Sequence, residues 1–106
     1  MSIRDLDPVI HAPKRLGAMA ILANTSSTDF GFLRDHLDLS DSDLSKQMTA
    51  LQDAGYISVH KSGRGRGGTT TYSITSAGRD AYRSHVAALQ AITAPAGAPP
   101  SSPDPS

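Results

Sequence analysis

The chain has 106 residues, 38% of them apolar, and its ten basic and ten acidic side chains cancel to a formal net charge of zero. This length predicts one domain with a single modest core, and a stability of roughly 0.05–0.15 kcal/mol per residue favours a homodimer over an isolated chain. No stretch approaches the roughly 20 apolar residues of a membrane span, and the lack of cysteine excludes disulfides and thiol redox chemistry. We therefore expect a soluble, cytoplasmic protein.

The N-terminal part of the chain predicts two helices. Asp7 followed by Pro8 is typical of an N-cap with proline at the first helical position. A second helix is expected to begin at Pro13 and to end at about Ala23, and the polar stretch 24–28 predicts a loop. The residues expected to face inward are Leu6, Val9 and Ile10 in the first helix, and Leu16, Met19, Ala20 and Ala23 in the second.

The middle of the chain predicts two further helices joined by a short turn. Residues 29–30 are expected to form a brief strand or a lead-in, followed by a helix over about 31–37. Ser40 is a good N-cap for the next helix, with Asp43 as a weaker substitute for the glutamate of a capping box, and Gly55 marks its end. The expected inward stripes are Phe32, Leu33, His36 and Leu37 in the first, and Leu44, Met48 and Leu51 in the second.

A β-hairpin is expected after these helices. Residues 56–60 alternate between apolar and polar, and 69–74 are β-branched and aromatic enough for a returning strand. The stretch 62–68 between them contains four glycines and predicts a loop. Because no acid lies between Asp53 and Asp80, positive charge is concentrated at this hairpin, where it can steer a partner although the total charge is zero.

The C-terminal part predicts one long helix and a tail. Thr75 is the expected cap of a helix from Ser76 to about Ile92, so that the ordered domain covers 1–92. The Pro-, Ser- and Ala-rich residues 93–106 predict disorder. The apolar stripe of the long helix, which we predict to be a dimer interface, consists of Tyr82, Val86, Leu89 and Ile92.

The order helix, turn, helix, strand, basic loop, strand favours double-stranded DNA as the partner. A helix with a polar outer face can enter the major groove while a cationic hairpin contacts the adjacent backbone or minor groove. Any surface helix also has a polar face that is simply exposed to solvent, so such a face alone does not indicate DNA binding. For Asp43 the preferred interpretation is that it caps the helix. The predicted DNA-binding residues are Ser42, Asp43, Ser45, Lys46, Thr49, Lys61, Arg64 and Arg66.

Catalysis and metal binding find little support in the sequence. There is no cysteine nucleophile, no glycine-rich phosphate motif leading into a helix, and no Ser/His/Asp set in a recognisable context. The histidines fall on four different elements without ligand spacing, which predicts ordinary packing or surface positions for His11, His36, His60 and His85. We expect no enzyme activity, no cofactor and no bound metal.

The chain resembles the winged helix–turn–helix transcriptional regulators, specifically the small MarR-like group, in three stretches: LDPVIHAPKRLGAMAILA (6–23), FLRDHLDLSDSDLSKQMTALQDAGYI (32–57) and YSITSAGRDAY (72–82). The resemblance implies an α+β, mostly helical fold: a winged helix–turn–helix with a two-stranded β-wing at Lys61–Thr69 and a C-terminal dimerisation helix. Asp43 departs from the asparagine common in this family, and its carboxylate could instead accept a hydrogen bond from cytosine N4.

The resemblance further implies a homodimeric regulator, in the simplest case a repressor, on a pseudo-palindromic operator. It also implies a small-molecule effector, held near Leu16, Ala20, Tyr82 and Leu89. The sequence leaves one alternative open, a winged-helix docking module that does not bind DNA, because the acids between Asp35 and Asp43 suit a basic protein partner.

Overall fold

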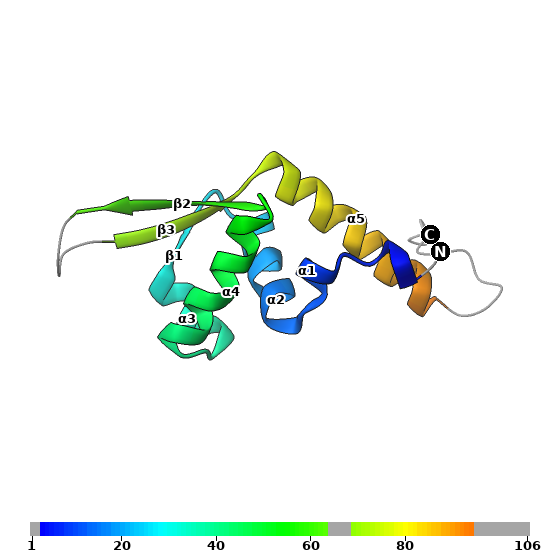
Figure 1. The fold of residues 1–106 in the computed structure, drawn as a ribbon, viewed down its shortest axis with the longest axis horizontal. Coiled ribbons are helices and arrows are strands. Elements are labelled where there is room, and N and C mark those ends of the chain that lie inside the picture. Colours follow the sequence, from blue (N-terminus) through cyan, green and yellow to red (C-terminus); the bar gives the residue numbers. More distant parts are fainter. Residues whose placement is uncertain (1–2, 64–68, 95–106) are drawn as a thin grey trace, which may run out of the picture.

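The computed structural model describes residues 3–63 and 69–94. The predicted DNA-binding residues Arg64 and Arg66 lie outside this part of the chain, and so do residues 95–106 of the tail predicted for 93–106, whose first residue, Thr93, is the last residue of a helix. In chain order the elements are η1 (Ile3–Asp5), α1 (Pro8–His11), α2 (Pro13–Ala23), β1 (Thr28–Asp29), α3 (Phe30–Leu37), α4 (Asp41–Asp53), β2 (Ile57–Ser62), β3 (Thr69–Ile74) and α5 (Ser76–Thr93) (Figure 1).

Side-chain caps begin the helices where the sequence predicts them. Asp7, Ser40 and Thr75 each accept hydrogen bonds from backbone N–H groups in the first turn of α1, α4 and α5. A further cap, Asp29, accepts from the backbone N–H of Phe32 at 2.6 Å and begins α3 one residue earlier than predicted. Gly55 follows the end of α4 with a φ of +82°, as expected for the left-handed residue beyond a helix C-terminus.

The core lies where α1, α2, α3 and α4 meet the base of the sheet. The predicted stripe of α4 is confirmed, because all three of its apolar residues are buried. In α2 the prediction was partly wrong: Ala18, Met19 and Leu22 are buried, whereas the other predicted positions are half-buried. The buried core consists of Ile10, Ala18, Met19, Leu22, Leu33, Leu44, Met48, Leu51, Ile57 and Tyr72.

The inward face predicted for α3 was also partly wrong. Leu33 is buried and Leu37 half-buried, but Phe32 remains 51% exposed and stacks on the exposed ring of His36, with 5.4 Å between the ring centroids. The four positions span an arc of about 140° around the helix, at 3.6 residues per turn. The core covers only one edge of that arc, so the aromatic pair lies on the surface.

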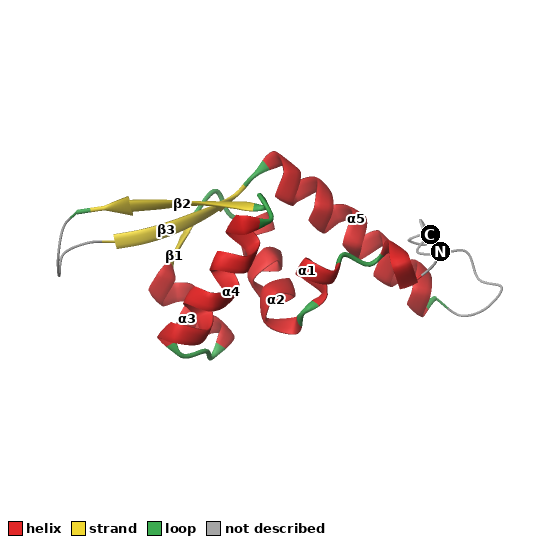
Figure 2. Cartoon of the chain, viewed as in Figure 1, coloured by secondary structure: helices red, strands yellow, loops and turns green. Residues whose placement is uncertain are grey.

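The sheet is antiparallel with the strand order β1-β3-β2. β2 pairs with β3 along its whole length, from Ile57 opposite Ile74 to Ser62 opposite Thr69. β1 pairs with the other edge of β3, so the predicted two-stranded wing has a third, short strand at its base. The β2–β3 hairpin extends beyond the helical body at one end of the molecule, and α5 extends from the other (Figure 2).

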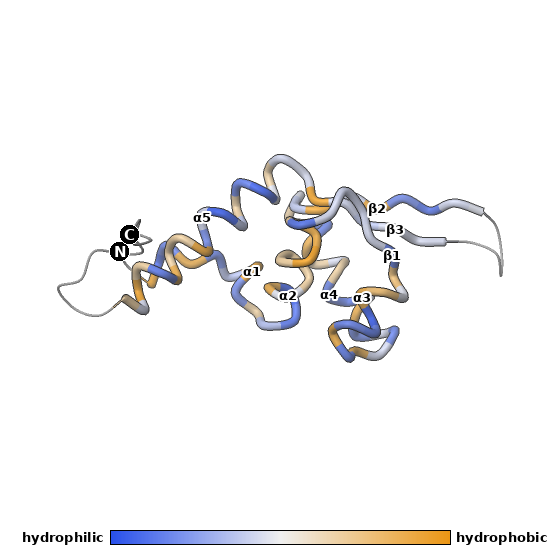
Figure 3. The backbone as a smooth tube through the Cα atoms, turned by 180° about the vertical axis from the view of Figure 1, so that it is seen from behind, coloured by the Kyte–Doolittle hydropathy of each residue, from blue (hydrophilic) through white to orange (hydrophobic). Residues whose placement is uncertain are grey.

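The long helix α5 does not bury the stripe that the sequence predicts as apolar. Its buried residues are Gly78, His85 and Ala88. Apolar positions nevertheless recur along α5 towards its C-terminal end (Figure 3). The predicted dimer residues Tyr82, Val86, Leu89 and Ile92 are all half-buried in the single chain.

His85 joins α5 to the N-terminal part of the chain. Its side chain is 1% exposed, and its Nδ1 accepts a hydrogen bond from the backbone N–H of Asp7 at 3.0 Å. Asp7 in turn accepts from the hydroxyl of Tyr56, and the ring of His11 lies 5.4 Å from that of His85. Because Nδ1 is an acceptor, the neutral ring carries its proton on Nε2, which is buried without a hydrogen-bond partner in the described structure.

We expect the protein to lose stability as the pH falls below about 6.5. Burial lowers the pKa of His85 below its ordinary value of 6.5; the nearby His11 acts in the same direction and Asp7 opposes it. The unfolded chain therefore binds this proton more readily than the folded chain. The contribution of neutral His85 to the free energy of unfolding is complete above the pKa of this residue in the unfolded chain. It is lost as the pH falls towards the lower pKa of His85 in the folded chain, by up to about 1.4 kcal/mol per pH unit.

Urea unfolding at pH 7.5, 6.5 and 5.5 measures this loss. The variant His85→Gln, which keeps an acceptor for the Asp7 N–H, should be less sensitive to acid than the wild type. The control is His60→Gln in the exposed part of β2, which should retain the full acid sensitivity. A wild-type free energy of unfolding that stays constant over this range contradicts the prediction.

Candidate nucleic-acid interface

α4 presents a continuous polar strip to solvent. Ser42, Ser45, Lys46 and Thr49 are all exposed, and they fall within an arc of about 100° around the helix. The buried apolar residues of α4 lie on the opposite side. The strip is therefore free to contact a partner without disturbing the core.

A cleft of about 240 Å³ separates this strip from the wing. Ser45 and Thr49 line it from α4, and Lys61 lines it from β2. Three of the predicted DNA-binding residues are thus brought together by the packing of α4 against β2. The remaining lining residues are Met48, Gln52, Val59 and Tyr72.

Gln52 is a cleft residue that the sequence prediction missed. It follows Ser45 by seven positions and Thr49 by three, so the helical period alone places it on the same face. Its side-chain amide can both donate and accept hydrogen bonds. Val59 is one of the apolar positions of the alternating stretch 56–60, and nothing in the sequence indicates that it lines the cleft.

Asp43 lies on the flank of α4 away from the wing and is already engaged. Its carboxylate accepts hydrogen bonds from Lys14 Nζ at 2.6 Å and from Gln47 Nε2 at 2.8 Å. The Lys14 hydrogen bond, followed by that of Gln47, lowers the pKa of the Asp43 carboxyl. Its backbone N–H is capped by Ser40, but its carboxylate bonds across to α2 instead of completing a capping box.

Gln47 continues this network into the interior. It is only 9% exposed, and its Oε1 accepts a hydrogen bond from Arg15 Nη1 at 2.8 Å. The Nε of Arg15 donates to the carbonyl of Val9 in α1. The network joins α1, α2 and α4, and it fixes the flank of α4 that carries Asp43.

The acidic residues around the helix–turn–helix are partly neutralised. Arg34 Nε lies 3.0 Å from Asp35 Oδ1, and Arg34 Nη1 lies 3.1 Å from Asp41 Oδ1. The acidic surface that suggested a basic protein partner is therefore weaker than the sequence alone implies. Both pairs are exposed, so they contribute little to stability.

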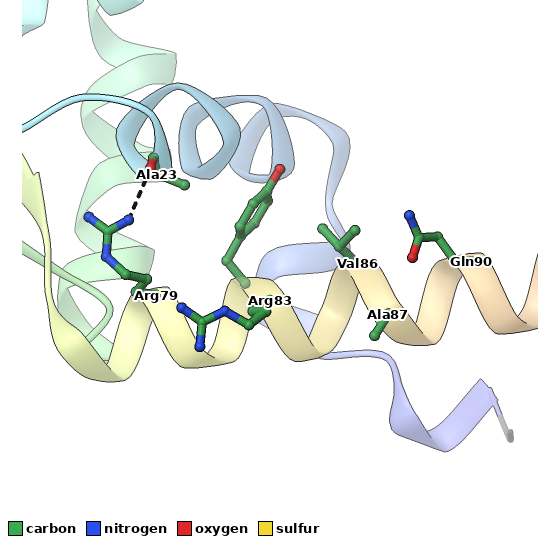
Figure 4. A pocket seen from close by; sticks show the side chains of 7 residues that line it. Ala23, Arg79, Arg83, Val86, Ala87 and Gln90 are labelled. Carbon is green, nitrogen blue, oxygen red and sulfur yellow. Dashed lines mark hydrogen bonds between the residues drawn. The ribbon is translucent and has the colours of Figure 1, made fainter. Parts of the chain in front are cut away.

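A second cleft, of about 400 Å³, lies between α5 and the end of α2 (Figure 4). Arg79 borders it and donates a hydrogen bond to the carbonyl of Ala23 at 3.0 Å. Of the residues predicted to hold an effector, only Tyr82 lines this cleft. The full lining is Ala23, Arg79, Tyr82, Arg83, Val86, Ala87 and Gln90.

The histidines occupy three separate surroundings. His11 lies beside His85, His36 stacks on Phe32, and His60 is exposed in β2. Over residues 3–63 and 69–94, no group of three His, Cys, Asp or Glu side chains is placed to hold a metal ion. Within the same ranges no helix has both the length and the apolar character needed to cross a membrane.

The chain matches a known protein family and resembles solved structures. Residues 14–93 match the model of the winged helix DNA-binding domain family. A transcriptional regulator homologue from Pyrococcus horikoshii OT3 has a similar structure, with a TM-score of 0.74, 25% sequence identity, and coverage of 79% of this chain and 83% of that one. No match was found among curated protein sequences.

Two further solved structures share the fold at lower identity. The putative transcriptional regulator ytfH from Salmonella typhimurium has a TM-score of 0.69 at 18% identity, covering 79% of this chain and 74% of its own. NadR, solved in complex with 4-hydroxyphenylacetate, has a TM-score of 0.61 at 20% identity, covering 80% of this chain and 65% of its own.

The narrower MarR-like grouping stays a prediction, because the similar structures also include an ArsR family transcriptional regulator. The family itself does not depend on that distinction. With its paired helices α3 and α4, its β1-β3-β2 sheet and a family match that extends over most of its length, this chain belongs to the winged helix DNA-binding domain family.

Proposed function

We propose that this protein is a transcriptional regulator that binds duplex DNA as a homodimer at a pseudo-palindromic operator. The observation that carries the proposal is the cleft in which Ser45 and Thr49 of α4 face Lys61 of the wing. A helix in the major groove and a cationic strand beside it can then contact one duplex at the same time. The family and the regulators with a similar fold support this reading.

The residues of the interface have different tasks in this proposal. Lys61 of β2, together with Arg64 and Arg66 outside the described residues, supplies phosphate neutralisation and most of the affinity. Ser45, Lys46 and Thr49 reach base edges and supply sequence preference. Ser42, in the first turn of α4, is placed to donate to a phosphate near the helix N-terminus.

The half-buried stripe of α5 supports the homodimer. A second copy that covers Tyr82, Val86, Leu89 and Ile92 buries apolar surface that the single chain leaves accessible. A two-fold arrangement then presents two α4 helices to half-sites about one helical turn apart. Repression is the simplest mode of action, because a bound dimer blocks the duplex that it covers.

The cleft between α2 and α5 supports a small-molecule effector. Its volume of about 400 Å³ falls within the range of small-ligand sites, and it contains two residues of the proposed dimer stripe, Tyr82 and Val86. A ligand bound there would contact both the DNA-binding part and the dimer helix. The complex of NadR with 4-hydroxyphenylacetate shows a small molecule bound to a protein of similar fold.

The combined substitution Arg64→Ala and Arg66→Ala tests the wing. We expect weaker binding to every duplex sequence, and a slope of log K against log salt that is less steep by about 1.8, because two phosphate contacts are lost. The duplex is first selected by the wild-type protein from random sequence, and binding is measured by fluorescence anisotropy at several salt concentrations. Arg4→Ala, which removes one exposed positive charge from η1, is the control for the loss of charge outside the interface and should bind as the wild type does.

Three outcomes contradict parts of the proposal separately. If the wild type retains no random duplex even at low salt, DNA binding is wrong and the docking alternative is favoured. Unchanged affinity and salt dependence in the double variant exclude the wing as a DNA contact. A stoichiometry of one chain per selected duplex excludes the homodimer.

A further inference from the structure

An exposed ion pair lies on the flank of α4 opposite the wing cleft. Lys14, in the first turn of α2, places its Nζ 2.6 Å from Oδ2 of Asp43, and the two side chains are 51% and 27% exposed. At 3.6 residues per turn, Asp43 lies about 120° around α4 from Thr49, with Lys46 between them. The polar strip of α4 is therefore bordered by the wing on one side and by this ion pair on the other.

The pair does not account for the stability of α4. Exposed ion pairs contribute between about 0 and 1 kcal/mol. A carboxylate in the first turn of a helix is favourable even without a partner, because it faces the positive end of the helix dipole.

Asp43 cannot readily turn away from this flank. One carboxylate oxygen accepts from Gln47, whose own amide oxygen is held by Arg15 in a buried position. The other oxygen accepts from Lys14. A fixed negative charge thus lies at the border of the strip that we propose enters the major groove.

A duplex that receives α4 brings a phosphate backbone to each side of the helix. On the wing side Lys61 meets it. On the other side the Asp43 carboxylate would repel phosphates unless a cation neutralised it, since like charges in an interface carry a substantial energetic cost. Among the described residues, Lys14 is the basic side chain within ion-pair distance of Asp43.

We propose, as an extension of the DNA-binding function proposed above, that Lys14 is a further determinant of DNA binding that acts by neutralising the fixed carboxylate of Asp43. Lys14 comes from α2, outside the helix–turn–helix and the wing. Lys14 contributes to DNA binding only as long as Asp43 carries a negative charge that must be neutralised. Removing both charges should therefore restore what removing the cation alone destroys.

A double-mutant cycle tests this dependence on the selected duplex. Lys14→Met, which keeps most of the alkyl chain, is expected to weaken binding by about tenfold at low salt, and less at high salt, because the exposed carboxylate is screened. Asp43→Asn should bind at least as tightly as the wild type. The variant carrying both substitutions should bind within about threefold of Asp43→Asn, so that the two effects are not additive.

Two controls separate this role from a structural one. Thermal unfolding of Lys14→Met should match that of the wild type, because the exposed pair adds little stability. Arg4→Met removes an exposed positive charge from η1, which belongs neither to the α4–wing interface nor to the α2–α5 cleft, and should leave binding unchanged.

If Lys14→Met binds as tightly as the wild type, or if the variant carrying both substitutions is as weak as Lys14→Met, the inference is overturned. A wild type and an Arg4→Met variant that bind normally then show that the DNA-binding proposal itself survives. A wild type that fails to bind any duplex overturns both.

Discussion

Replacing Gly78 by alanine is expected to lower the free energy of unfolding by about 3 kcal/mol or more. A Cβ atom built on Gly78 would lie 2.0 Å from the carbonyl oxygen of Tyr56 and 2.8 Å from its carbonyl carbon. That oxygen is held in place, because it accepts a hydrogen bond from the backbone N–H of Thr75 at 3.0 Å. The first turn of α5 must then move away from the start of β2, or the backbone of both must distort.

The direction of this effect is opposite to that of most such substitutions in helices. Glycine to alanine within a helix normally stabilises by up to about 1 kcal/mol. Gly31→Ala, in the first turn of α3, is the matched control, since its Cβ would meet Asp29 Oδ1 at an ordinary 3.7 Å. Urea unfolding followed by circular dichroism should show Gly31→Ala equal to or more stable than the wild type. A stability of Gly78→Ala within 1 kcal/mol of the wild type contradicts the close approach of α5 to Tyr56.

The contact at Gly78 also has a consequence for assembly. It sets where α5 leaves the sheet, and α5 carries the stripe proposed to form the dimer. In the proposed dimer, the distance between the two α4 helices would therefore depend on backbone packing at this glycine, which is not one of the proposed DNA-binding residues.

Thr49→Glu is expected to weaken binding to the selected duplex by about 100-fold or more while leaving the fold intact. Thr49 lies near the middle of the exposed strip of α4 and lines the cleft to the wing. In the proposed complex a carboxylate at this position would lie against phosphates and base edges, where it would add charge repulsion and offset the positive charge of the neighbouring lysines. Because glutamate is a better helix former than threonine, the midpoint temperature of thermal unfolding should not fall.

The matched control for this substitution is Ser84→Glu, which makes the same charge change on the exposed face of α5. It lies outside the proposed dimer stripe and should change the dissociation constant by no more than about threefold, because the interaction is screened over that distance. Fluorescence anisotropy at constant salt measures both variants. Equal losses in the two would indicate a general charge effect, and no loss for Thr49→Glu would exclude α4 as the groove-facing helix.

The elements that the sequence predicts well are those that depend on interactions between residues close together in the sequence. α2 and β3 have their predicted bounds, and the caps at Asp7, Ser40 and Thr75 were confirmed. A cap joins groups only two or three residues apart, so its signal is contained in a short stretch of sequence. The polar strip of α4 was predictable for the same reason, because its period follows from the helix alone.

Contacts between distant parts of the chain could not be predicted in this way. Lys14 pairs with Asp43 across 29 positions, and Asp7 bonds His85 across 78. No pattern in the sequence indicated either pair, because the packing of the helices decides which charged and polar groups come within hydrogen-bond distance of one another. The sequence indicated a brief strand or lead-in at 29–30, but it did not show that the strand, β1, lies at Thr28–Asp29 and pairs with β3.

By itself, then, the amino-acid sequence determined the order of the helices and the β2–β3 hairpin, most of the helix starts and the outward face of α4, all of which depend on local hydrogen bonds and periodicity. Tertiary structure alone decided which apolar edges of α3 and α5 are covered, that α4 and the wing enclose one cleft, and that Asp43 is neutralised by a lysine from another helix. Periodicity shows that a face is apolar or polar, but what covers that face depends on the packing of elements far apart in the chain.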